Sequence, residues 1–259
     1  MDPHQKFKAE VAENIRRMAE DRKLHELSLE WSKATGLYGY TYNFSWLGTP
    51  IIQLPADIVA MQELIWQARP DLIIETGIAH GGSLVMSASM LVLLDYSEAL
   101  ENGRALDPSK PRRKVLGIDI DIRDHNRAAI EAHPMANRIE MIQGSSTAPA
   151  VVAQVRQRAS GCRSVLVCLD SDHTHEHVLA ELRAYAPLVT PGSYCVVFDT
   201  LIEDRPAGFF ADRPWGKGNN PKTAVWEFLR THPEFEIDKS IPTKLQITVA
   251  PDGYLKRIA

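Results

Sequence analysis

The chain has 259 residues, of which 44% are hydrophobic, and this is enough for a full core without disulfides or a structural metal. The net charge of −4 and the lack of a long basic stripe argue against a nucleic-acid-binding protein, so the basic run 112–114 is expected in a solvated loop. No stretch reaches the roughly 20 apolar residues that span a bilayer, and the longest run, 85–94, is predicted to be a buried helix.

Residues 1–54 are predicted to form an N-terminal segment distinct from the rest. Apolar residues at helical spacing, among them Phe7 and Val11, predict one or two amphipathic helices over 7–32, which could pack against a second copy of the chain. The charged start lacks the apolar region of a secretory signal. The aromatic, glycine-rich stretch 35–55 is either an irregular packing segment or a lid over a substrate.

Residues 55–259 are predicted to form one α/β domain, because short apolar strands alternate with helices at least five times. A polar insertion at 95–113 is expected on the surface. The pattern predicts a mainly parallel sheet with helices on both faces. Ligands bind such a sheet beyond the carboxyl ends of its strands. Strands are expected at 71–76, 115–120, 138–144, 164–170, 192–200 and 244–250.

The first strand ends in the motif E-T-G-x-x-x-G-G-S, which contains Glu75, Gly77, Gly81 and Ser83. Glycines allow a sharp turn and a close approach of a ligand to the backbone. The helix that follows offers free N–H groups to an anion. The spacing differs from the dinucleotide pattern G-x-G-x-x-G, and no P-loop is present, so an NAD-dependent oxidoreductase is disfavoured.

The next two strands also end in polar residues. Asp119 closes the second strand, where an acid can accept hydrogen bonds from both ribose hydroxyls of a nucleoside. The alternative is that Asp119 and Asp121 cap the next helix. The third strand ends in Gly144-Ser145-Ser146, which could bind an adenine edge, cap a helix, or do both.

These motifs, at these separations, resemble the cofactor motifs of class I methyltransferases. The motifs L-D-S-D-H-x-H, P-G-S-Y-C-V-V-F-D-T-x-I-E-D, R-P-W-G-x-G-N-N-P and P-I-I-Q-L-P-x-D are similar to the cephalosporin hydroxylase / rhamnosyl O-methyltransferase family, from about Tyr38 to the end. The resemblance implies a Rossmann-like sheet of seven strands in the order 3-2-1-4-5-7-6 with the last strand antiparallel. It also implies S-adenosylmethionine, often a divalent cation, and transfer to a hydroxyl of a sugar or natural product.

Asp170 and Asp199 close the fourth and fifth strands, so the two carboxylates are expected at one rim. They would repel each other unless protonated or bridged by a cation, and Mg²⁺ prefers such oxygen ligands. Alternatively, one caps a helix and the other pairs with a basic residue. His173 follows Asp170 by three residues, and a helix starting there would turn it toward the rim as a general base. In related sugar O-methyltransferases, an Asp-x-x-His arrangement supplies a metal ligand and a base, which implies the same roles for Asp170 and His173. His175 and His177 are expected to face solvent.

One position departs from the family pattern. Members often carry two consecutive acids at the end of the fifth strand, but this chain has Phe198 before Asp199. Mg²⁺ held by Asp170 and Asp199 is still the expected metal, but with one ligand missing it could be weakly bound or absent, and Thr200 or Glu203 could substitute for that ligand. This leaves two other interpretations open, a hydroxylase-type oxidative partner and a non-catalytic cofactor-binding module.

Aromatic residues from two segments are expected to form the acceptor pocket. Trp215 lies in the loop 213–221, which either folds over the substrate or is an ordinary surface loop. With Tyr42 and Trp46 it would form a wall suited to a sugar or polyketide-like ring. Three cysteines without a CxxC pair indicate a reducing cytoplasm. The expected partner is a small hydroxyl-bearing acceptor.

Overall fold

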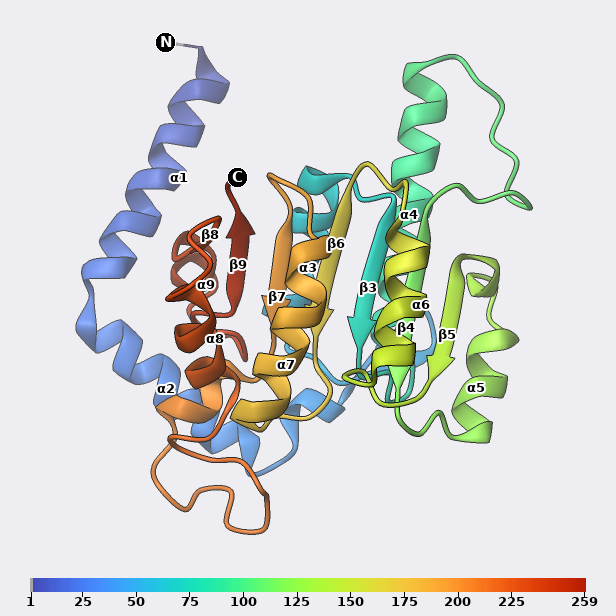
Figure 1. Ribbon diagram of the computed structural model, residues 1–259. Helices are drawn as coiled ribbons and strands as arrows, with labels where there is room; N and C mark the ends of the chain where they lie inside the picture. The colour runs from blue at the N-terminus through green and yellow to red at the C-terminus, as the bar shows by residue number, and fades with distance from the viewer. Residues whose placement is uncertain (1) are drawn as a thin grey trace.

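The computed structural model describes residues 2–259 and contains a seven-stranded sheet between two layers of helices (Figure 1). The strand order is β5-β4-β3-β6-β7-β9-β8, with β3 to β7 parallel and β9 antiparallel to both of its neighbours. The strands are β3 (Leu72–Thr76), β4 (Lys114–Asp119), β5 (Ile139–Gln143), β6 (Val165–Leu169), β7 (Tyr194–Val197), β8 (Phe235–Ile237) and β9 (Tyr254–Arg257). The predicted Rossmann-like order 3-2-1-4-5-7-6 is therefore confirmed.

Helices cover both faces of the sheet, and the sheet separates the core into two hydrophobic clusters. Side chains on a strand alternate between faces, so Ile73 packs in one cluster and Ile74 in the other. Because both of their faces are buried, the central strands β6 and β7 are almost uniformly apolar. One cluster includes α3 (Pro55–Ala68), α4 (Gly82–Glu101), α5 (Asp124–Glu131) and α9 (Ser240–Leu245), and the other α6 (Pro149–Ala159), α7 (His175–Tyr185) and α8 (Pro221–Leu229).

The N-terminal segment begins with two helices, as expected, α1 (Pro3–Glu20) and α2 (Arg22–Gly36). Helix α1 buries none of its residues, leaves Phe7 exposed, and runs along the β8 side of the sheet in contact with α9 (Figure 1). A short hairpin of β1 (Phe44–Trp46) and β2 (Thr49–Ile51) follows and packs on α4. This hairpin brings the end of the segment close to the carboxyl ends of the parallel strands.

Two expectations about the sheet and its connections are wrong. The segment 244–250 is not a strand, because α9 extends to Leu245 and Gln246 then adopts a left-handed φ of 62° that breaks the chain direction. The antiparallel strand is instead β9, and Gly253 allows it to approach β7, since a Cβ there would lie 2.0 Å from the Val197 carbonyl oxygen. The polar insertion begins later than expected, because α4 continues to Glu101.

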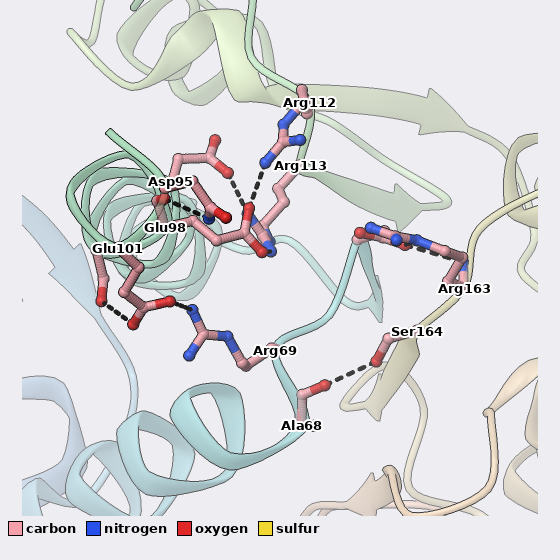
Figure 2. A network of polar contacts seen from close by, with 12 residues as sticks. Ala68, Arg69, Asp95, Glu98, Glu101, Arg112, Arg113, Arg163 and Ser164 are labelled. Atoms are coloured by element: carbon pink, nitrogen blue, oxygen red, sulfur yellow. Dashed lines mark hydrogen bonds and ion pairs between the residues drawn. The ribbon is translucent and has the colours of Figure 1, made fainter. Parts of the chain in front are cut away.

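The basic run 112–114 is also not a solvated loop, because Arg113 is buried in a network of ion pairs (Figure 2). Arg113 pairs with Asp95 and, at 2.8 Å, with Glu98, both on α4. Arg138, just before β5, adds a 2.7 Å contact to Asp95. Hydrogen bonding to Arg113 is the main cause that lowers the pKa of Glu98 to about 2. The network fastens α4 to the amino-terminal ends of β4 and β5, at the opposite edge of the sheet from the strand-end residues.

Helix α4 is the one helix within residues 2–259 whose length and apolarity would suffice to cross a membrane. Half of its most apolar window is buried inside the protein, and α4 contacts α3, β4 and the β1–β2 hairpin. These contacts are those of a core helix, and its apolar character follows from that position.

Candidate active site

A cavity of about 620 Å³ lies at the carboxyl ends of the parallel strands. These strand ends form the lower edge of the sheet in Figure 1. Residues at the tips of five adjacent strands line this cavity. They are Ser145 after β5, Asp119 on β4, Gly77 after β3, Asp170 after β6 and Asp199 after β7. The structure therefore brings the strand-end residues expected from the sequence into one cleft.

Two glycines, one in the turn after β3 and one at the start of α4, are packed too tightly to be replaced by a residue with a side chain. A Cβ on Gly77, which has a φ of 88°, would lie 2.0 Å from the Asp170 carbonyl oxygen. A Cβ on Gly82 would lie 2.2 Å from the Pro50 carbonyl oxygen. The lack of a side chain at Gly77 therefore lets the turn after β3 lie against the tip of β6. The lack of one at Gly82 lets the β1–β2 hairpin lie against the first turn of α4. The resulting wall is formed largely by backbone, which a ligand can approach closely.

Asp119 holds the glycine-rich turn from the tip of β4. Its Oδ2 accepts a hydrogen bond from the backbone N–H of Ile78 at 2.8 Å, and its Oδ1 accepts one from the N–H of Asp121 at 3.0 Å. The backbone N–H of Ala79 also donates to Oδ2, at 3.5 Å. A carboxylate has about four acceptor positions, so one remains beside these three contacts for a ligand hydroxyl group. Asp121 is exposed and is not part of the cavity wall.

Glu75 and Gly144 do not line the cavity, unlike the other residues expected to bind a cofactor. Glu75 is buried and accepts a hydrogen bond from the hydroxyl of Ser83, which does line it. Burial raises the pKa of Glu75 to about 7. Gly144 lies behind Ser145, where a Cβ would be 2.9 Å from Val151. Glu75 and Gly144 thus support the wall from behind.

Asp170, His173 and Asp199 form the one group of three ligand-type side chains found within residues 2–259, with ligand atoms all within 4.8 Å of one another. His173 Nε2 lies 3.1 Å from Asp199 Oδ2. Burial, followed by the charges of Asp199 and Glu75, raises the pKa of Asp170 well above its usual range. Two carboxylates and an imidazole nitrogen are a donor set that fits a divalent cation, which would relieve this repulsion.

The two neighbouring histidine expectations need correction. Helix α7 begins at His175, so His173 lies in the loop after β6 and reaches the rim without a helical turn. His175 is not solvent-facing, because its ring contacts Thr223 at 2.8 Å and Glu227 at 3.2 Å. The ring of His173 instead packs edge-on against Trp215, with centroids 4.9 Å apart.

The position that departs from the family pattern is filled by packing. Phe198 is buried in the core cluster beneath α3 and α4 and is absent from the cavity wall. Neither suggested substitute faces the carboxylates. Thr200 donates its hydroxyl hydrogen bond to the Pro251 carbonyl. Glu203 accepts from the N–H of Gly218 at 2.7 Å and so holds the loop before α8.

Two of the three aromatic residues expected at the acceptor pocket are on the cavity wall, namely Tyr42 and Trp215. Trp46 is not, because its indole N–H donates to Ser89 Oγ on α4 at 3.0 Å and its ring packs on the core. Asn220 helps to fold the Trp215 loop inward by donating to the Gly216 carbonyl at 2.9 Å.

The cavity also contains residues that sequence reasoning missed. His177 was expected in solvent, but its Nε2 lies 3.1 Å from both Ser146 Oγ and Ser171 Oγ. Hydrogen bonding to the buried Glu181 raises the pKa of His177. Gln53 lines the opposite wall, and its only sequence signal is its place in P-I-I-Q-L-P-x-D.

Comparison with known proteins gives consistent results. The model of the family Rhamnosyl O-methyltransferase/CmcI matches residues 38–258. The chain is similar to the rhamnosyl O-methyltransferase of Mycobacterium leprae, with 30% identity over 215 residues and 82% of each chain covered. It is also similar to that of Mycobacterium tuberculosis, with 28% identity over 237 residues, covering 89% of this chain and 80% of the relative.

Two solved structures share the fold. One is described as "CmcI-N160 apo-structure", with 20% identity, a TM-score of 0.56, and 84% of this chain and 77% of that chain covered. The other is described as "cmcI-D160 Mg-SAM", with 18% identity, a TM-score of 0.51, and 84% and 78% covered. At these identities the likeness concerns the fold alone.

Proposed function

Because the chain belongs to the rhamnosyl O-methyltransferase/CmcI family and is thus an S-adenosylmethionine-dependent O-methyltransferase, we propose that it methylates a hydroxyl of a sugar or sugar-bearing natural product with the help of Mg²⁺. The observation that carries this proposal is the single cavity at the strand tips. Nucleoside-binding candidates lie on one side of Gly77, and Asp170, His173 and Asp199 lie on the other.

The nucleoside of the cofactor is assigned to the tips of β4 and β5. Asp119 accepts a ribose hydroxyl with the position left free by its three backbone contacts. Ser145 and Ser146 offer small polar groups to the adenine edge. The glycine-rich turn with Gly77 and Gly81 lets the cofactor pass close to the backbone toward the tip of β6.

The reaction itself needs alignment and a proton acceptor. The acceptor oxygen bonds to the methyl carbon as the carbon–sulfur bond of the sulfonium breaks, and the hydroxyl proton passes to His173. Asp199, 3.1 Å from Nε2 of His173, orients the imidazole and stabilises the positive charge that the ring gains. Trp215 holds the other side of the ring.

The same rim supplies the ligands for a divalent cation. Asp170 and Asp199 would hold it, and when bound it would lower the pKa of a coordinated hydroxyl. Phe198 removes one carboxylate from the family pattern, so more of the coordination positions are left to water and to acceptor oxygens.

The acceptor is assigned to the part of the cavity between the N-terminal segment and the loop before α8. Tyr42 and Trp215 give this part aromatic walls, which suit the apolar face of a sugar ring. The stretch 35–55 at the end of the N-terminal segment thus serves as a lid over the domain formed by 55–259. The three cysteines are free, which agrees with a place in the cytoplasm.

The test is to incubate the protein with S-adenosylmethionine, Mg²⁺ and a panel of rhamnosides, and to measure S-adenosylhomocysteine and singly methylated acceptor by mass spectrometry. Asp170→Asn is the matched inactive control. Methylated sugar formed by the wild type alone supports the proposal. Cofactor binding without product from any sugar would instead favour a non-catalytic cofactor-binding module.

A further inference from the structure

Gln53 lies on the cavity wall, in the loop between β2 and α3, and this loop is fixed from two sides. On one side, the backbone at Pro50 lies against Gly82 in the first turn of α4. On the other, the buried carboxylate of Asp57 in the first turn of α3 accepts hydrogen bonds from the segment 248–254. The loop therefore holds Gln53 beside the amino-terminal end of α4.

Within residues 2–259, the amide oxygen of Gln53 has no hydrogen-bond partner. The residue is 5% exposed, and its Oε1 is buried without a hydrogen bond. Buried polar atoms nearly always have a partner, so an unpaired amide at a cavity wall points to a partner on a bound molecule. Half a turn about the soft terminal torsion exchanges the oxygen and nitrogen, so the amide can offer the cavity an acceptor or a donor.

The order of the strand tips indicates which part of a bound cofactor reaches Gln53. Asp119 and Ser145, at the tips of β4 and β5, lie on one side of Gly77, and the tip of β6 lies on the other. With the nucleoside over β4 and β5, the amino-acid end extends past Gly77 toward the first turn of α4. That end carries ammonium donors and carboxylate acceptors, and an amide can pair with either group.

We infer that Gln53 binds the amino-acid end of S-adenosylmethionine, its amide accepting from the ammonium group through the oxygen or, after half a turn of the terminal torsion, donating to the carboxylate through the nitrogen. This assignment rests on the proposed function, because it takes the position of the nucleoside from it. It gives the cofactor an anchor at its amino-acid end, besides the contacts proposed for the nucleoside and the glycine-rich turn.

Calorimetry with two ligands tests the assignment directly. S-adenosylhomocysteine contains the amino-acid end, and 5′-methylthioadenosine is the same thionucleoside without it. Gln53→Leu should lose about tenfold or more in affinity for S-adenosylhomocysteine, because a hydrogen bond to a charged group is lost. Its affinity for 5′-methylthioadenosine should stay within about twofold. Gln154→Leu, at an exposed position on α6, is the matched control and should change neither affinity.

Thermal unfolding without ligand separates binding from a structural role. Gln53→Leu should unfold at the same temperature as the wild type or higher, because it removes an unpaired buried amide. Gln53→Met, which keeps the chain length, should show the same difference between the two ligands. Unchanged affinity for S-adenosylhomocysteine overturns the inference, and so does an equal loss for both ligands. A wild type that binds neither ligand would contradict the proposed function itself.

Discussion

His173 Nε2 lies 3.1 Å from Asp199 Oδ2, although the two residues follow different strands, β6 and β7. The contact fixes the direction of the imidazole at the rim of the cavity. It also places the ring beside both carboxylates of the proposed cation site. One imidazole is thus positioned to take a proton from an acceptor hydroxyl while a neighbouring carboxylate stabilises the charge it gains.

Removing the proton acceptor should impair turnover far more than cofactor binding. A general base contributes about 100-fold or more to the rate, so His173→Ala should reduce kcat by at least that factor. Affinity for S-adenosylhomocysteine, measured by calorimetry, should stay within about threefold. His175→Ala is the control, because His175 contacts Thr223 and Glu227 outside the cavity. Equal turnover in both variants would rule out the role of His173.

Asp119→Ala should weaken cofactor binding about tenfold or more, because a hydrogen bond from the ribose to a charged acceptor is lost. Asp121→Ala, two residues away and exposed, should bind the cofactor like the wild type. Both affinities can be measured by titration with S-adenosylhomocysteine, with circular dichroism as a check that the variants fold. Wild-type affinity in Asp119→Ala would reject the ribose contact.

A divalent cation should stabilise the protein through Asp170 and Asp199. Mg²⁺ binding to the folded state raises the melting temperature in proportion to its occupancy, and it offsets the repulsion between the two carboxylates. The wild type should therefore show a melting temperature that rises with Mg²⁺ concentration and a loss of turnover on dialysis against a chelator. Asp199→Asn should show little dependence on Mg²⁺. The same Mg²⁺ response in the wild type and the variant would mean that the cation binds elsewhere.

Glu75 should make the ligand-free protein less stable as the pH rises. Its pKa is raised from 4.5 to about 7 by burial, so the folded state holds the proton more tightly than the unfolded state. The decrease in the free energy of unfolding that Glu75 causes is absent below about pH 4.5 and grows as the pH rises to about 7. It then stays constant at about 3 kcal/mol. Urea unfolding should show Glu75→Gln gaining stability over the wild type across this range. A difference that does not vary with pH would show that Glu75 is not the cause.

The buried ion pairs at the other edge of the sheet should matter for stability alone. Asp95→Ala leaves Arg113 and Arg138 buried without this partner and should lower the free energy of unfolding by about 3–5 kcal/mol. Glu101→Ala breaks only exposed contacts, with Arg69 and Ser97, and should change the free energy of unfolding by less than about 1 kcal/mol. Urea titration gives both values. Affinity of folded Asp95→Ala for S-adenosylhomocysteine should be unchanged, and a large loss would show coupling between the two edges.

The sequence alone was enough to predict the order of the sheet and the part of the cavity wall at the strand ends. Apolar runs that alternate with amphipathic helices leave few options other than a parallel sheet covered on both faces, and parallel strands end at one edge. Asp119, Asp170 and Asp199 could therefore be placed at that edge from their positions at the ends of apolar runs. Predictions failed where a local pattern had two solutions, as at 244–250, where α9 and a left-handed Gln246 replaced the expected strand.

Only the tertiary structure decided which polar side chains have partners and which face the cavity. The buried position of Arg113, the support of Ser83 by Glu75 and the unpaired amide of Gln53 all depend on residues distant in sequence. For the same reason, the sequence placed Trp46 on the cavity wall, where the structure packs it on the core, and it placed His177 in solvent, where the structure has it lining the cavity. Periodicity records which face of an element is buried, but the partner of a buried polar group is set by how the elements pack.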